Sequence, residues 1–230
     1  MPTGSSQGGS TGQVEILHSG YFARRNAFDW VLALAVICGC VFAFMQYHAA
    51  MDVYEKGILI AAVPCAIMLA WFWRPLGILM LVVAGLSLAG IVSYQGNLAR
   101  AETVFWLKYF LSSQSAILWM SMLFFMSTVF YWIGVFAKGR AEGMELVASR
   151  LVWVAVTMAL TGTMVRWYES YLLGADIGHI PVSNLYEVFV MFCWMTATFY
   201  LYFEAQYKTR ALGAFVMLVV SAAVGFLLWH

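Results

Sequence analysis

Hydrophobic residues are concentrated in long runs along the chain, with short polar stretches between them. A helix needs about 20 consecutive apolar residues to cross the ~30 Å hydrocarbon core of a bilayer. Seven segments approach that length, and they predict spanning helices at residues 28–47, 56–73, 76–94, 117–136, 151–168, 185–203 and 211–230. Pro64 lies inside the second segment and predicts a kink there. The pattern therefore predicts an all-α, polytopic transmembrane helix bundle.

Two polar stretches fall outside these segments. Residues 1–27 are rich in Gly, Ser and Thr at their start, which predicts a flexible tail ahead of a membrane domain at residues 28–230. The apolar run after Arg24 and Arg25 is too long for a cleavable signal peptide. Residues 95–116 contain an aromatic run that is too short and interrupted to span. This run predicts a short interfacial helix in an outer loop.

Composition narrows the function classes. The chain is 63% hydrophobic and 10% charged, whereas soluble domains carry about 45–50% apolar and about 25% charged residues. An ordinary soluble enzyme is therefore excluded, and the chain is expected to reside in a lipid bilayer. The formal net charge of +1 offers no basic field for nucleic acid. The four cysteines lie in apolar runs, which favours packing over metal binding.

The distribution of Lys and Arg predicts the orientation, because cytoplasmic loops carry an excess of these residues. One side of the predicted topology collects eight of them and the other side four, which accounts for all 12. The excess places the N-terminus in the cytoplasm and the end of this chain outside, on the periplasmic side. His48, His179 and His230 then fall on or near the outer face.

The densest polar cluster runs from Arg166 to Glu187. Arg166 and Glu169 are three residues apart, so on a helix they share a face and can pair. Asn184 is suited to the N-cap of the sixth segment, with Glu187 completing a capping box. Two interpretations remain open for Glu187. In the first, it only caps the helix. In the second, it belongs with its ionisable neighbours to a functional site at the membrane edge.

Histidines at the outer face raise the question of haem. Neutral imidazole binds haem iron well, and His48 and His230 end the first and seventh segments. Two such histidines could hold one haem at the outer boundary, although their spacing does not require it. The sequence contains no Walker A loop, dinucleotide fingerprint, HExxH or GxSxG motif. No predicted span carries a mid-membrane acidic residue, which disfavours an ion-coupled transporter.

The cluster also carries a family resemblance. The strings Arg-Trp-Tyr-Glu-Ser at 166–170 and Gly-His-Ile-Pro-Val-Ser-Asn-Leu-Tyr-Glu at 178–187 resemble the N-terminal half of the CcsA/ResC family of c-type cytochrome biogenesis proteins, often labelled CcsB in beta-proteobacteria. Residues 22–30, 108–119 and 210–215 support the resemblance. The family-motif positions taken as functional candidates are Arg166, Trp167, Glu169, Pro181, Ser183, Asn184, Tyr186 and Glu187.

The resemblance implies a role in the System II cytochrome c synthetase of the bacterial cytoplasmic membrane. With a ResB-like partner, such a protein takes haem b as its transported substrate from the cytoplasmic side. It presents the haem outside to the reduced CxxCH thiols of apocytochrome c.

The family also implies an external Trp-rich segment flanked by two haem-ligating histidines. No such segment occurs before the chain ends at Trp229 and His230. The chain is therefore expected to be an N-terminal portion that does not catalyse thioether formation alone. The family's haem-ligand role cannot be assigned to His48, His179 or His230, because the motif that contains the family's ligands is absent. These three histidines remain haem-ligand candidates only because they fall on or near the outer face.

Two alternatives stay open. A small-molecule transporter would need a midplane polar site or inverted repeats, and the sequence shows neither. A structural membrane subunit without a ligand would use its outer loops only as caps and interface helices. Loss of the haem absorption band in a His48→Ala or His179→Ala variant would exclude a purely structural subunit.

Overall fold

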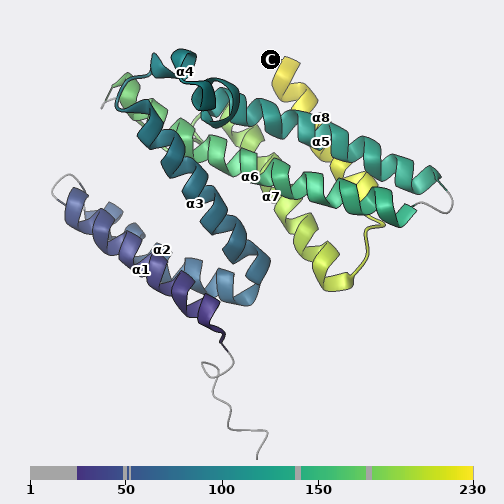
Figure 1. The fold of residues 1–230 in the computed structure, drawn as a ribbon, viewed down its shortest axis with the longest axis horizontal. Helices are drawn as coiled ribbons and strands as arrows, with labels where there is room; N and C mark the ends of the chain where they lie inside the picture. Colours follow the sequence, from purple (N-terminus) through teal and green to yellow (C-terminus); the bar gives the residue numbers. More distant parts are fainter. Residues whose placement is uncertain (1–24, 49–50, 52, 138–140, 175–177, 230) are drawn as a thin grey trace, which may run out of the picture. The chain divides into compact units, whose positions relative to one another are not determined.

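A computed structural model describes residues 25–48, 51, 53–137, 141–174 and 178–229. The described elements are all helical, which confirms the predicted fold class (Figure 1). The long helices are α1 (Ala27–Tyr47), α2 (Val53–Phe72), α3 (Arg74–Tyr94), α5 (Ser113–Phe136), α6 (Ala141–Leu173), α7 (Leu185–Tyr207) and α8 (Gly213–Trp229). The short elements are α4 (Arg100–Thr103) and a single π-helical turn, η3 (Leu107–Leu111).

The long helices correspond one to one with the predicted apolar segments. Five described helices are long and apolar enough to cross a bilayer, and two shorter apolar helices lie at Lys56–Phe72 and Gly213–Trp229. The chain is thus a helical, multi-pass membrane protein. Pro64 lies inside α2 as expected, and the kink predicted at that position stays a prediction.

The predicted bounds of the fifth segment are wrong. The sequence placed this helix at residues 151–168, with a long outer loop from 166, but α6 runs from Ala141 to Leu173. Hydropathy indicates only where a helix leaves the hydrocarbon core. The helix itself continues beyond that point when its polar side chains have hydrogen-bond or ion-pair partners. Arg166 and Glu169 therefore lie on the last turns of α6, where helical geometry fixes their directions.

The chain divides into two compact units, at residues 1–78 and 79–230. In the first unit, α1 packs against α2, and Asp29 is buried where α1 begins. Its carboxylate accepts a hydrogen bond from the backbone N–H of Asn26 (3.1 Å) and pairs with Arg74 (3.2 Å). His48 lies at the far end of α1, exposed, with Nδ1 3.2 Å from the carbonyl oxygen of Met45.

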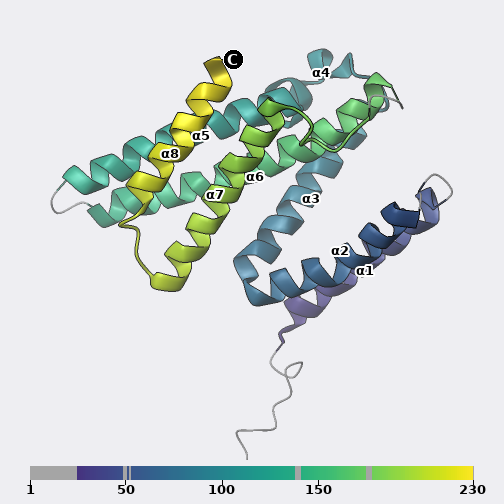
Figure 2. The same ribbon diagram turned by 180° about the vertical axis from the view of Figure 1, so that it is seen from behind.

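In the second unit, α5 contacts α6 and α8, and α7 contacts the same two helices (Figures 1 and 2). Gly162 allows α6 to approach α5 closely, because a Cβ atom there would lie 3.0 Å from Ile117 Cγ1 and 3.2 Å from Ala116 Cβ. Small residues serve this purpose in membranes, where lipid provides no hydrophobic force between helices.

Polar side chains also join the helices of the second unit. On α5, Thr128 Oγ1 donates to the carbonyl oxygen of Met217 on α8 (3.0 Å) and lies 2.7 Å from Ser221 Oγ. Where α7 ends, Glu204 accepts hydrogen bonds from Ser149 Oγ (2.8 Å) and Arg210 Nε (2.9 Å). These bonds tie α5 to α8, and α6 to the connection between α7 and α8.

The stretch between α3 and α5 is helical in pieces. Gln95 and Gly96 have positive φ angles of 47° and 74°, and they end α3 in a turn. α4, η3 and the N-terminus of α5 then follow, with Ser112 Oγ accepting from the N–H of Ser115 (3.3 Å). The single short helix expected here is therefore split, because Val104 has an extended backbone. Its location at the membrane interface stays a prediction.

Candidate functional site

Ionisable side chains gather at one end of the second unit, where α3 and α6 end and α5 and α7 begin. We call this group the polar end site. It comprises Tyr94 of α3, Ser113 of α5, Arg166, Glu169 and Ser170 of α6, His179 and Ser183 of the following connection, and Glu187 of α7. The sequence cluster from 166 to 187 is thus brought together in space, and residues from α3 and α5 complete it.

The predicted cap of α7 is confirmed in its first half. Asn184 is the N-cap, and its Oδ1 accepts from the N–H of Glu187 (2.8 Å). The second half differs from the prediction, because Glu187 Oε2 accepts from the N–H (3.1 Å) and Oγ (3.2 Å) of Ser183. The extended backbone of Asn184 (φ −124°, ψ 163°) places the N–H of Ser183 within reach of the carboxylate. Capping therefore uses one carboxylate oxygen of Glu187.

The other oxygen of Glu187 faces two basic groups. Oε1 lies 3.6 Å from Arg166 Nε and 3.7 Å from His179 Nε2. The Glu187 side chain is only 3% exposed, whereas that of Arg166 is 36% exposed. A buried carboxylate needs compensating charge or hydrogen bonds, and the guanidinium supplies charge without reaching hydrogen-bond distance. The carboxylate thus has two distinct functions, in the cap and in an ion pair.

The predicted pairing of Arg166 with Glu169 is wrong. Glu169, which is 7% exposed, accepts instead from the Tyr94 hydroxyl (2.5 Å), the Ser113 N–H (3.0 Å) and Ser113 Oγ (2.5 Å). These donors hold a carboxylate at the N-terminus of α5, where the helix dipole also favours negative charge. Because Glu169 is satisfied in this way, Arg166 is left to pair with Glu187.

Tyr94 and Ser113 were not predicted from the sequence. A tyrosine that ends an apolar segment and a serine in a Ser-Ser-Gln-Ser run are common features of helix ends. Neither feature indicates a distant acidic partner. The contacts depend on α3, α5 and α6 meeting at the same end, and this is decided by packing.

The connection that carries His179 is attached to α6. Ser170 Oγ accepts from the His179 N–H (3.3 Å) and donates to the carbonyl oxygen of Trp167 (2.7 Å). Gly178 lies against the ring of Tyr171, and a Cβ atom there would overlap that ring. Glycine is therefore required for the close approach that positions His179 beside Glu187.

Two spaces adjoin the site. An open cavity of about 370 Å³ is lined on its polar side by Lys108, Gln114, Arg166 and Glu169. A space of about 10 Å³, roughly the volume that one water needs, lies beside Glu187 and is lined by Pro181 and Tyr186 among others. Arg166 borders both spaces.

The remaining candidates lie elsewhere or are untested. Trp167 lines a separate apolar cavity between α3 and α6. His48 belongs to the first unit, and His230 lies outside the described residues. The hypothesis that two of these histidines share one haem therefore stays a prediction. Within the described ranges, no group of three or more His, Cys, Asp or Glu side chains is arranged to hold a metal ion.

Comparison with known proteins confirms the family resemblance. The chain is 28% identical over 109 residues to the cytochrome c biogenesis protein CcsA of Chlorella vulgaris, covering 46% of this chain and 31% of that protein. It is 31% identical over 102 residues to CcsA of Gloeobacter violaceus, covering 44% and 27%. It is also 31% identical over 97 residues to CcsA of Pyropia yezoensis, covering 42% and 28%.

The chain thus matches less than a third of the length of these relatives. No family model matches the chain. No solved structure matches it either.

Proposed function

We propose that this chain is a membrane subunit of a cytochrome c synthetase of the System II type. It handles haem b as a substrate and presents it for covalent attachment to apocytochrome c outside the cytoplasmic membrane of a bacterium. The observation that carries the proposal is the similarity to three proteins named cytochrome c biogenesis protein CcsA, at 28–31% identity.

The polar end site supports this proposal chemically. Haem carries an iron that imidazole can bind and two propionates that a guanidinium can pair with. His179 and Arg166 supply these groups side by side, each within 3.7 Å of Glu187 Oε1. Glu187 holds the two groups in place, and Arg166 also borders the 370 Å³ cavity. That cavity is smaller than a porphyrin, so only the propionate edge would enter it.

The orientation and partners follow from the same proposal. The Lys and Arg distribution of eight against four supports a cytoplasmic N-terminus and an outer location for the polar end site. A ResB-like membrane protein would then pair with this chain, and apocytochrome c would approach the outer face with its CxxCH thiols. Thioether formation would require the family's Trp-rich external segment in addition to this chain.

The test is a haem titration of the purified chain in lipid nanodiscs, followed by absorption spectroscopy. We expect a Soret band that His179→Ala weakens at least several-fold. The control is Glu142→Gln, an exposed position at the start of α6, which should leave the band unchanged. A Soret band equally strong in both variants and in His48→Ala would contradict the proposed site. Absence of a Soret band from the parent chain itself would favour a structural subunit without a ligand.

A second measurement addresses catalysis. The chain is incubated with excess haem and an apocytochrome c peptide that contains reduced CxxCH, and the peptide is examined by mass spectrometry. We expect no covalent haem on the peptide. If this chain alone attached haem covalently to the peptide, the expectation that thioether formation requires the Trp-rich external segment would be wrong.

A further inference from the structure

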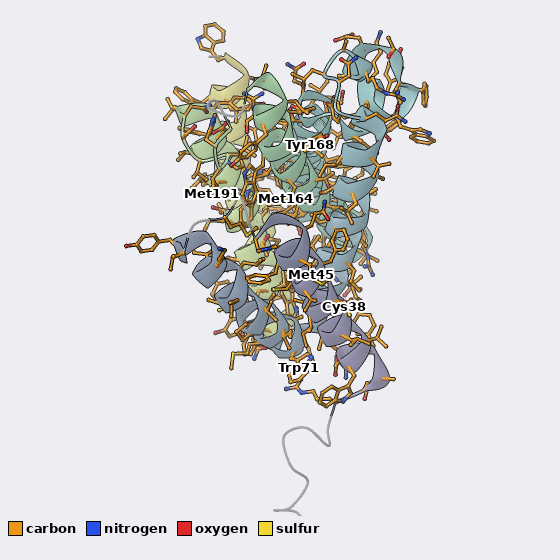
Figure 3. The ribbon with its side chains drawn as sticks, turned by 90° about the vertical axis from the view of Figure 1, so that its left-hand side faces the viewer. Cys38, Met45, Trp71, Met164, Tyr168 and Met191 are labelled. Atoms are coloured by element: carbon orange, nitrogen blue, oxygen red, sulfur yellow. The ribbon has the colours of Figure 1, made fainter. Side chains whose placement is uncertain are left out.

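An open cavity of about 690 Å³ lies in the second unit between α3 and α6, and none of its lining side chains is charged. Its walls are almost entirely apolar. Ala84, Ser87 and Ile91 contribute from α3, and Met164 and Tyr168 from α6. Met164 and Tyr168 are one turn apart, so they share a face of α6 (Figure 3).

The cavity exists because α3 touches α6 near one end. At Gly90, a Cβ atom would lie 3.2 Å from Val165 Cγ2, and Tyr94 donates to Glu169 of α6. Residues 80, 83, 84, 87 and 91 occupy the same face of α3 as this contact, but they line the cavity. The volume is within the range of small-molecule sites, about 300–1,000 Å³.

Ser87 provides the single polar feature of the α3 wall. Its side chain is 5% exposed, and Oγ has no hydrogen-bond partner among the residues that the structure describes. Other hydroxyl side chains on α3 and α6 do bond back to their own helix: Ser93 donates to the carbonyl oxygen of Ala89 (2.6 Å), and Thr163 donates to that of Ala159 (2.8 Å). Ser87 does not, and at this depth the bilayer offers no water in exchange. A hydroxyl donor in an apolar cavity therefore calls for a ligand with an acceptor.

The position of Ser87 limits the choice of ligand. It lies seven residues before Tyr94 ends α3, which is about 10 Å along the helix axis. Ester carbonyls of phospholipids stay near the headgroups, so an acceptor at this depth must belong to a molecule that is itself dissolved in the hydrocarbon. The acceptor must also be attached to an apolar body that fits between Met164 and Tyr168.

We propose that this cavity binds a prenylated quinone, with one ring carbonyl accepting a hydrogen bond from Ser87 Oγ. The ring lies against Met164 and Tyr168, and the isoprenoid chain leaves through the open side of the cavity into the bilayer. The inference concerns binding alone, and it is independent of the proposed handling of haem, because none of its residues carries the iron or propionate contacts.

The test is binding of a short-chain ubiquinone to the chain in nanodiscs of synthetic phosphatidylcholine, measured by quenching of tryptophan fluorescence. We expect Ser87→Ala to weaken binding about fivefold, the cost of one neutral hydrogen bond. Ala84→Phe should abolish binding because the ring occupies the cavity. The control is Thr161→Val, which removes a second buried hydroxyl that has no described partner but does not line the cavity. That variant should bind as the parent does.

Two results would overturn the proposal. One is equal affinity in the parent, Ser87→Ala and Ala84→Phe proteins, with helix content by circular dichroism unchanged in all three. The other is a phospholipid that co-purifies with the chain and that excess ubiquinone does not displace, which would assign the cavity to an acyl chain. If Ala84→Phe fails to fold, the comparison of Ser87→Ala with Thr161→Val decides the question alone.

Discussion

Replacing Glu187 with glutamine separates the two functions that the structure gives this side chain. Glutamine keeps an oxygen that can accept from the N–H and Oγ of Ser183, so the cap of α7 survives. It removes the negative charge that faces Arg166 at 3.6 Å. A protein that uses Glu187 only as a cap would tolerate the change, whereas one that uses its charge would not.

The magnitude follows from the distance and the burial. Two unit charges 3.6 Å apart attract by about 4.6 kcal/mol at an effective dielectric constant of about 20. Water screens part of this attraction, because Arg166 is one-third exposed, and desolvation of Glu187 offsets another part. We therefore expect a net coupling of ~1–2 kcal/mol between the two side chains.

A double-mutant cycle measures this coupling. Glu187→Gln, Arg166→Gln and the double variant are unfolded in mixed micelles, and loss of helix is followed by far-UV circular dichroism. Glu142→Gln serves as the matched control, because it removes a carboxylate that is exposed at the start of α6. It should change the free energy of unfolding by less than about 0.5 kcal/mol.

One outcome would refute the reasoning. If the coupling energy is below about 0.3 kcal/mol, within the usual error of additivity, the pair contributes nothing measurable. Glu187 would then be a capping residue alone, and its place beside Arg166 would carry no argument for a charged site.

Three further predictions concern the packing that positions the site. Glu169→Ala leaves buried donors on α3 and α5 without an acceptor, and the free energy of unfolding should fall by ~2–4 kcal/mol in the same micelle assay, whereas Glu169→Gln should lose less. Gly162→Leu overpacks the α5–α6 contact and should lower the free energy of unfolding by ~1–3 kcal/mol, measured in a thermal melt. Gly143→Leu is the control, because a Cβ atom at that position meets nothing within 4 Å. Thr128→Val removes the hydroxyl contact with Ser221 and should cost ~0.6–1.7 kcal/mol. An unchanged midpoint in any of these variants would contradict the corresponding contact.

Local features of the sequence were sufficient to locate the long helices and to identify half of the cap of α7. Apolar runs predicted each of the long helices that the structure describes, although the bounds of α6 were wrong. The reason is that backbone groups in lipid must be satisfied within the helix itself. Asn184 was recognised as the N-cap of α7, since its side chain acts on an N–H only three residues away. The family resemblance of residues 166–187 was also readable, because it depends on residue identities alone.

Pairing between distant side chains was decided by the tertiary structure. Sequence spacing predicted that Arg166 pairs with Glu169. In the structure, Tyr94 and Ser113 donate hydrogen bonds to Glu169. Arg166 pairs with Glu187 instead. The cavity beside Ser87 likewise depends on where α3 touches α6. Spacing along one helix determines which residues share a face. The partner that a buried carboxylate binds depends on which neighbouring helix places hydrogen-bond donors close enough to replace the water around it.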